Sequence, residues 1–175
     1  MEAKRAVELD PLSALICSAL SWFFTLAGRF EDALKIAQDI LEFDPNNFYG
    51  KYSLAIAYAR MGLHEEAIFA FKGLEYFYYT PGYLGSLYSK TGRKDEAQKL
   101  LTELLHRWEK GYFPPYVIAA VYSGLAEKEK TFEWLDRAYE NRDVNQYYFK
   151  VDPLFAELHS DPRWKEQMKK RGLAD

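Results

Sequence analysis

The feature that most constrains the fold is a pattern that returns along the chain about every 34 residues. The string GRFEDALKIAQDILEFDPNN, which begins at Gly28, has an echo in GLHEEAIFAFKGLEYF, which begins at Gly62. Further copies begin at Gly92 and Ala126, although the step from Gly62 to Gly92 is only 30 residues. Self-similarity at this period is typical of chains in which each repeat buries its apolar face against its neighbours. The sequence therefore predicts a stack of repeats.

Each copy has the pattern of two helices joined by a glycine turn. In the first copy the apolar residues follow a 3.6-residue period, as in one buried helical stripe, at Leu12, Leu15, Ile16, Ala19, Leu20, Phe23 and Ala27. Gly28, Gly62 and Gly92 suit the left-handed conformation that ends a helix. The acidic pair that follows each of them suits the positive end of the next helix better than a catalytic role, because it recurs once per repeat. We therefore expect an all-α chain of antiparallel helix pairs.

This pattern resembles the tetratricopeptide repeat, W-x2-L-G-x2-Y, then A-x3-F, then A and P. Four copies meet its positions in phase: Leu20, Ser21, Phe24, Ala33, Ala37 and Pro45; Leu54, Ala55, Tyr58, Ala67 and Phe71; Leu84, Gly85, Tyr88, Ala97 and Leu101; and Ile118, Ala119, Tyr122, Thr131 and Ala138. The opening Trp is absent, and Cys17, Lys51, Pro81 and Pro115 stand in its place. The resemblance implies a right-handed α-solenoid with repeats at about 14–47, 48–77, 78–111 and 112–145.

The two ends of the chain differ from the repeats. Residues 1–10 look like the last turns of the second helix in a truncated preceding repeat, and residues 146–175 are expected to be capping helices. Two Asp-Pro helix starts, Asp152-Pro153 and Asp161-Pro162, lie in this C-terminal segment. With FEWLDRAYENRD before it, the ending is similar to the tetratricopeptide tails of bacterial regulators that carry a winged-helix, nucleotide-cyclase or kinase domain upstream. The resemblance implies a scaffold that is part of a larger cytoplasmic bacterial protein.

No motif for nucleotide binding or nucleophilic catalysis occurs in the sequence. The single cysteine, Cys17, excludes an internal disulfide, and His64, His106 and His159 lack the spacing of metal ligands. The net charge of −3 does not favour a nucleic-acid module. The longest apolar run, from Leu12 to Gly28, is shorter than the ~20 residues that a spanning helix needs. We therefore expect no enzyme, cofactor, metal, nucleic-acid or membrane function.

The aromatic residues are the candidates for partner binding. In tetratricopeptide proteins the stripe at positions two, five, nine and twelve of each repeat lines a concave groove that binds partner peptides. With the neighbouring Tyr83, this resemblance assigns the groove to Trp22, Tyr49, Tyr52, Tyr79, Tyr83, Phe113 and Tyr116. Such rings suit apolar or proline-containing segments that accept hydrogen bonds from Tyr hydroxyls. Packing between repeats remains the alternative for each ring.

The sequence thus predicts a non-enzymatic protein–protein interaction module that binds a protein or peptide partner in an aromatic groove. Homo-oligomerisation, with a homodimer as its simplest form, is the alternative, because open-ended repeat stacks expose apolar surface. RNA binding fits less well, because related helical repeats that bind RNA have a longer period and a basic groove. The cluster YFYYTPGY at residues 76–83 lies where the repeat is shortened, and it either plugs that junction or forms a pocket.

Overall fold

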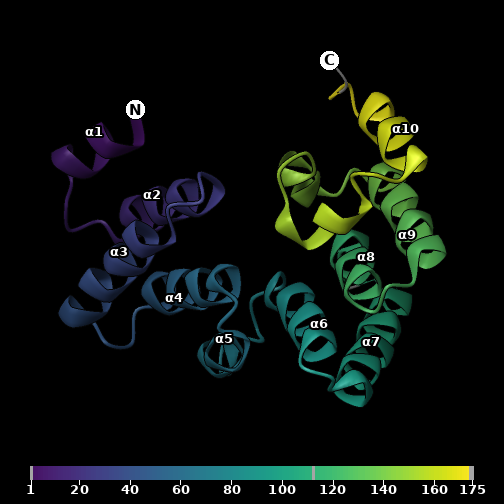
Figure 1. Cartoon of the computed structure of the whole chain (residues 1–175), viewed down its shortest axis with the longest axis horizontal. Coiled ribbons are helices and arrows are strands. Elements are labelled where there is room, and N and C mark those ends of the chain that lie inside the picture. The colour runs from purple at the N-terminus through teal and green to yellow at the C-terminus, as the bar shows by residue number, and fades with distance from the viewer. Residues whose placement is uncertain (1, 112, 174–175) are drawn as a thin grey trace. The chain divides into compact units, whose positions relative to one another are not determined.

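The structure is a computed structural model that describes residues 2–111 and 113–173, and over these residues it contains helices and no strand. Its internal contacts divide the chain into two compact units, residues 1–75 (unit 1) and 76–175 (unit 2). Unit 1 comprises α1 (Glu2–Leu9), α2 (Ala14–Leu26), α3 (Phe30–Phe43), α4 (Phe48–Met61) and α5 (His64–Phe71) (Figure 1). Unit 2 comprises α6 (Thr80–Lys90), α7 (Lys94–Glu109), α8 (Pro115–Gly124), α9 (Lys128–Glu140), the 3₁₀ helices η1 (Val144–Tyr148) and η2 (Pro153–Leu158), and α10 (Pro162–Lys170).

The helices pair in the order that the repeat pattern predicts. Within unit 1, α2 packs against α3 and α4 against α5, and within unit 2 the pairs are α6 with α7 and α8 with α9. Each predicted repeat span therefore contains one helix pair, while the handedness of the solenoid stays a prediction. The predicted boundaries at residues 1, 112 and 174–175 lie outside the described residues.

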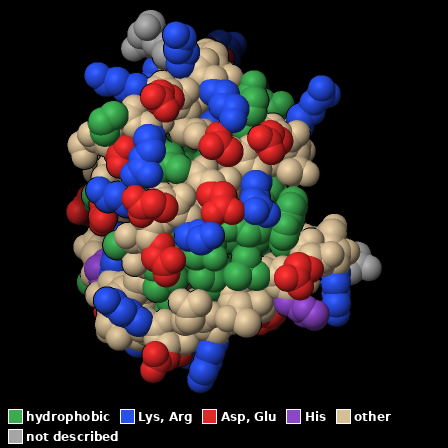
Figure 2. All heavy atoms as spheres, turned by 90° about the vertical axis from the view of Figure 1, so that its right-hand side faces the viewer, with side chains coloured by type: hydrophobic (Ala, Val, Ile, Leu, Met, Phe, Trp, Pro, Cys, Tyr) green, Lys and Arg blue, Asp and Glu red, His purple; other side chains and the backbone are tan. Residues whose placement is uncertain are grey.

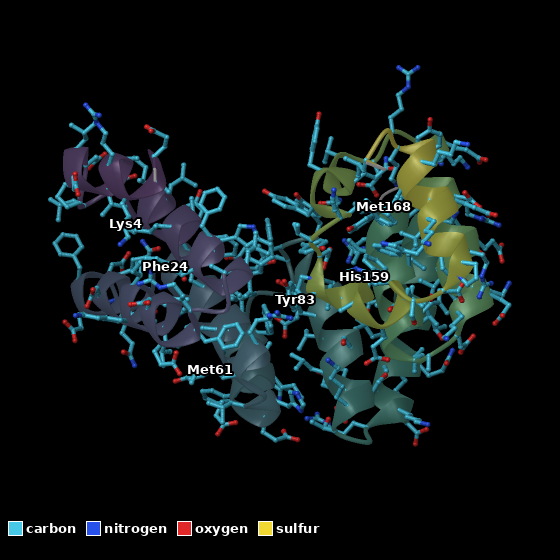
Figure 3. The ribbon with its side chains drawn as sticks, turned by 45° about the horizontal axis from the view of Figure 1, so that its top comes forward. Lys4, Phe24, Met61, Tyr83, His159 and Met168 are labelled. Carbon is cyan, nitrogen blue, oxygen red and sulfur yellow. The ribbon has the colours of Figure 1, made fainter. Side chains whose placement is uncertain are left out.

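The core of unit 1 forms where α2, α3 and α4 meet. Leu20, Phe24, Ala33 and Ala57 make one buried cluster, and the Ser21 hydroxyl donates to the Ala33 carbonyl at 3.0 Å. Because Ala33 has no large side chain, α3 can approach α2 closely enough for this bond. Lys4 of α1 lies over the Phe24 ring, 5.6 Å from its centroid (Figure 3). Helix α1 therefore packs against α2 although none of its residues is buried.

Local signals explain where α4 begins and ends. The Asn47 side chain accepts hydrogen bonds from the backbone amides of Tyr49 and Gly50, which satisfies two donors of the first turn. At the other end Gly62 has φ +80°, the left-handed conformation that stops a helix and turns the chain. The glycine turns that the sequence predicts are therefore present.

Small residues bring α6 and α8 together in unit 2. A Cβ on Gly85 would lie 2.7 Å from Val121, and one on Gly124 would lie 2.6 Å from the Cα atom of Ser86. These distances are too short for a carbon, so only glycine permits this approach. As a result every residue of α8 from Pro115 to Tyr122 is buried.

The C-terminal segment of unit 2 folds as η1, η2 and α10. Asp152 and Asp161 accept hydrogen bonds from backbone amides at the starts of η2 and α10, as the Asp-Pro pairs predict. The segment has its own apolar core, in which Phe149 stacks on Trp164 with ring centroids 4.2 Å apart. Helix α10 is an α-helix, whereas the other two elements are 3₁₀ helices of five or six residues. Such short helices favour the tighter 3₁₀ turn.

The outer face of unit 2 carries charges of both signs. Figure 2 shows Lys and Arg side chains interleaved with Asp and Glu side chains, with apolar areas between them. Ion pairs of unit 2 include Lys170 with Asp136 at 2.7 Å, which links α10 to α9, and Glu133 at 2.9 Å from both Lys130 and Arg137. Such exposed pairs add little stability.

Candidate functional site

The four predicted groove residues of unit 2 lie in a buried aromatic cluster and its surroundings. Tyr79, Tyr83, Phe113 and Tyr116 expose 9%, 2%, 4% and 0% of their surface. The Tyr79 ring stacks on Tyr116 at 6.2 Å and meets the edge of Tyr83 at 5.8 Å. Phe113 precedes α8, with the Arg107 guanidinium 4.4 Å from its centroid. The structure therefore brings three of the four together as one cluster and places Phe113 in a cation–π contact.

The C-terminal segment covers this cluster through Asp152. The Asp152 carboxylate is 1% exposed and accepts hydrogen bonds from the hydroxyls of Tyr79 and Tyr116, the latter at 3.0 Å. The other oxygen of this carboxylate accepts a hydrogen bond from the backbone amide of Leu154 at 3.0 Å. A buried carboxylate is tolerated when its oxygens are hydrogen-bonded in this way.

The two tyrosines are held as hydrogen-bond donors. Burial raises the pKa of Tyr79 well above 10, and the neighbouring Asp152 charge raises this pKa further. The pKa of Tyr116 is raised by the same two causes in the same order. Both hydroxyls therefore keep their protons over the physiological pH range and continue to donate to the carboxylate.

The residues after Asp152 complete the contact. The Ser123 hydroxyl of α8 donates to the Leu154 carbonyl at 2.8 Å, and the Phe155 ring meets the edge of Tyr116 at 5.2 Å. The Leu154 side chain lies beside Gly82 of α6, since a Cβ at that glycine would be in ordinary contact with it, at 3.5 Å. We call residues 152–155, Asp-Pro-Leu-Phe, the inner segment. It is held by tyrosine hydroxyls, a serine hydroxyl and apolar contacts, as a bound peptide would be.

The four rings differ from the open groove that the sequence predicts. All four are buried, and the inner segment contacts two of them, Tyr79 and Tyr116. Their role in partner binding stays a prediction. Sequence reasoning identified Asp152 as a helix cap and missed its bonds to the tyrosines. Tyr79 and Tyr116 precede Asp152 by 73 and 36 residues, and no local pattern links residues so far apart.

In unit 1 the predicted groove residues are only partly buried. Tyr49 is 38% exposed, and Tyr52 and Trp22 are half-buried. Tyr49 and Tyr52 both contact Phe48, at 5.4 Å and 5.7 Å between ring centroids. Trp22 lies on α2, which packs against α4. Phe48 joins the two tyrosines and was not among the predicted residues, because it falls outside the stripe positions.

The remaining reactive groups do not converge. Cys17 is buried in unit 1, where burial raises the pKa of its thiol, so the thiolate is disfavoured. Over residues 2–111 and 113–173, no group of three or more His, Cys, Asp or Glu residues is arranged to hold a metal ion. Within the same residues, no helix has both the length and the apolar character needed to cross a membrane.

Comparison with known proteins agrees with the repeat pattern. Residues 84–111, which include most of α6 and all of α7, match the family model described as the tetratricopeptide repeat. A search of curated proteins gave no match for the chain.

Proposed function

From the match of residues 84–111 to the tetratricopeptide repeat family and from the helix pairs described above, we propose that the chain is a non-catalytic interaction module that binds a segment of a partner protein on the aromatic face of unit 1. That face is Trp22, Phe48, Tyr49 and Tyr52. The observation that carries the proposal is the inner segment, because it shows how tyrosines at these repeat positions hold a stretch of polypeptide in unit 2.

The repeat phase relates the two sets of tyrosines. Tyr49 precedes Tyr79 by 30 residues, and Tyr52 precedes Tyr116 by 64, so each pair holds the same repeat position. In unit 2 both hydroxyls bond a segment that contains a proline. In unit 1 the equivalent rings are partly exposed. The matching partner is an apolar or proline-containing segment whose oxygen atoms accept hydrogen bonds from the Tyr49 and Tyr52 hydroxyls.

Selection from a library of random peptides displayed on phage tests this proposal on the full chain. Peptides selected on the wild type should bind Tyr49→Ala and Tyr52→Ala at least about tenfold more weakly, because aromatic anchors dominate such interfaces. Tyr147→Ala is the matched control, since Tyr147 is a tyrosine of unit 2 that is 88% exposed. Circular dichroism verifies that each variant keeps its helices. Failure to select any peptide, or equal binding to all variants, would contradict the proposal.

A second candidate function, self-association, is favoured by the surface of α2. The helix contains no charged residue, and it exposes Leu15, Phe23 and Leu26 by 57%, 48% and 37% along one side. The same side of α8 packs against α6, with Val121 against Gly85 and Gly124 against Ser86. The side of α2 therefore has the chemistry of a helix-packing face, and a second copy of α2 would suit it.

Sedimentation at several protein concentrations tests self-association. The wild type should show a concentration-dependent dimer, and Phe23→Glu should weaken it at least about tenfold by placing a charge in the apolar contact. Phe69→Glu is the control, because Phe69 is 80% exposed on a different helix, α5. A wild type that sediments as a monomer at every concentration would exclude this candidate.

A further inference from the structure

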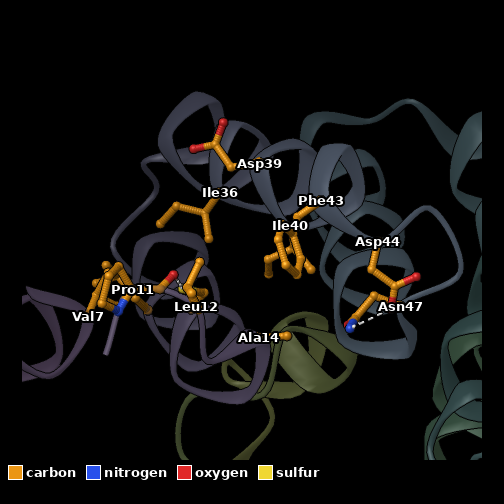
Figure 4. Close-up of a pocket in the computed structure, with 12 residues that line it drawn as sticks. Val7, Pro11, Leu12, Ala14, Ile36, Asp39, Ile40, Phe43, Asp44 and Asn47 are labelled. Atoms are coloured by element: carbon orange, nitrogen blue, oxygen red, sulfur yellow. Dashed lines mark hydrogen bonds between the residues drawn. The ribbon is translucent and has the colours of Figure 1, made fainter. Parts of the chain in front are cut away.

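Unit 1 contains an apolar pocket that is distinct from its aromatic face. The pocket has a volume of about 400 Å³ and lies between the end of α1, the start of α2 and the second half of α3 (Figure 4). Most of its wall is apolar, and the side chains that decide its shape are Leu12, Ala14, Cys17, Leu20, Ile36 and Ile40. None of the predicted groove residues lines it. Leu12 and Phe43, which are 74% and 78% exposed, lie at its edge.

The sequence explains why space is left there. Cys17 holds the position at which the repeat pattern has a tryptophan, and it faces the pocket together with Leu20. A cysteine fills far less volume than an indole, so the neighbouring Ile36 and Ile40 lack the contacts that a large side chain would supply. Protein interiors are close-packed, and a pocket of this size falls within the range of ligand sites. The space therefore suits an aromatic ring that comes from another molecule.

The charges around the pocket indicate which residues would flank the incoming aromatic side chain. Asp39 and Asp44 line its edge, whereas no Lys or Arg does. Burial raises the pKa of the Cys17 thiol, and the negative charges of Asp10 and Asp39 raise this pKa further. The imbalance extends over the unit: residues 1–75 contain 7 Lys or Arg and 11 Asp or Glu, a net charge of −4, against 16 and 15 in residues 76–175. A cationic ligand is complementary to this edge.

We propose that this pocket is a second binding site, which takes an aromatic side chain flanked by Lys or Arg on a segment of a partner protein. The ring enters between α2 and α3 against Leu20, Ile36 and Ile40, and the flanking cations lie beside Asp39 and Asp44. The site goes beyond the proposed function, since it shares no residue with the aromatic face and does not require that face to bind anything.

The test titrates the peptide acetyl-Gly-Lys-Trp-Arg-Gly-amide into the isotope-labelled full chain and follows the amide and methyl NMR signals. Saturable shifts are expected at Leu12, Cys17, Ile36 and Ile40. A peptide with Ala in place of Trp, and one with Glu in place of both basic residues, should each bind at least about tenfold more weakly. Higher salt should weaken binding of the basic peptide, because the carboxylates at the edge are exposed.

Two matched pairs of variants make the test specific. Cys17→Trp supplies the missing ring from within and should abolish binding, whereas Cys17→Ser leaves the volume open and should preserve it. If Cys17→Trp does not fold, Asp39→Lys tests the proposal instead, and it should weaken peptide binding at least about tenfold. Glu31→Lys makes the same charge change elsewhere on α3, outside the pocket lining, and should have a much smaller effect.

Several results would overturn the proposal. The absence of saturable shifts would do so, as would tight binding to Asp39→Lys or to a folded Cys17→Trp. Shifts confined to Tyr49 and Tyr52 would mean that the peptide uses the aromatic face, so the pocket proposal would fail while the proposed function stood. Shifts at Leu12 that depend on protein concentration without peptide would identify a second copy as the occupant.

Discussion

At the scale of single residues, the turn between the paired helices imposes its conformation whatever residue occupies it. In the four repeats the same backbone bond closes the turn: from Arg29 to Phe24, Leu63 to Tyr58, Arg93 to Tyr88 and Glu127 to Tyr122. Glycine holds the left-handed position in the first three turns, and Ala126 holds it in the fourth with φ +60°. The repeat phase predicts that Ala126 occupies this position. It does not reveal that an alanine adopts the glycine conformation, because the closing bond is a property of the folded turn.

The strain at Ala126 gives a first prediction. Ala126→Gly should stabilise the protein by about 1 kcal/mol, because a Cβ in the left-handed region costs about 1–2 kcal/mol and glycine loses part of this gain through its more flexible unfolded chain. Ala27→Gly is the matched control at the end of α2, where φ is −81° and glycine only adds entropy to the unfolded state. Urea unfolding should give changes of opposite sign, and a loss of stability in both variants would refute the strain at Ala126.

Asp152 gives a second prediction at the same scale. Asp152→Ala should destabilise the protein by about 2–3 kcal/mol, because it leaves the buried hydroxyls of Tyr79 and Tyr116 without their acceptor. Asp161→Ala is the comparison, since Asp161 also starts a helix before proline but its carboxylate bonds the nearby Arg163. Urea unfolding should show a smaller loss for Asp161→Ala. Equal losses would mean that the tyrosine bonds contribute nothing beyond the helix cap.

At the scale of helices, the sequence predicts features set by neighbouring residues, such as helices and turns. It does not predict contacts between residues that are far apart in the sequence. The apolar period and the glycine turns identify both helices of each repeat. The pairing of Gly85 with Val121, or of Tyr116 with Asp152, depends on which elements meet, and single-sequence patterns do not specify that. The same limit explains the rings: their repeat positions are readable from the sequence, but the contacts of the inner segment with Tyr79 and Tyr116 are not.

The close approach of α6 and α8 gives a third prediction. Gly124→Ala should cost about 2 kcal/mol, because its Cβ would meet the backbone of Ser86, which cannot turn aside. Gly50→Ala is the comparison within a helix, since its Cβ would meet only the side chains of Ile40 and Leu41 at 2.9 Å. Those side chains can rotate, and alanine favours the helix. Thermal unfolding should therefore show a larger loss for Gly124→Ala, and the reverse order would contradict the packing described.

At the scale of the whole molecule, burial is distributed unevenly along the chain. Helix α1 has no buried residue, whereas α8 is buried from Pro115 to Tyr122. In repeat proteins each element is stabilised mainly by its neighbours, so an element with few contacts opens independently. The repeat pattern predicts similar repeats, but it does not predict this difference, which comes from the C-terminal segment packing on α8 as well.

This uneven burial gives a fourth prediction. In native-state hydrogen exchange, amides of α1 should exchange fastest among the helices and those of α8 slowest, because opening α8 requires its contacts with α6, α9 and η2 to break. Uniform protection across α1 and α8 would show that the chain opens as a single unit. Measuring the amide exchange rates at pH values on both sides of neutrality verifies that these rates report the opening of the helices.

The uncovered side of α2 also makes the fold a directional building block. A designed helix pair fused ahead of α2 could pack on this uncharged apolar side, as a neighbouring repeat would. A pair inserted after α9 would have to displace Phe149, Phe155 and Trp164, which are buried at 0%, 0% and 6% exposure. Engineered lengthening of this fold should therefore succeed by growth ahead of α2 and fail by insertion after α9.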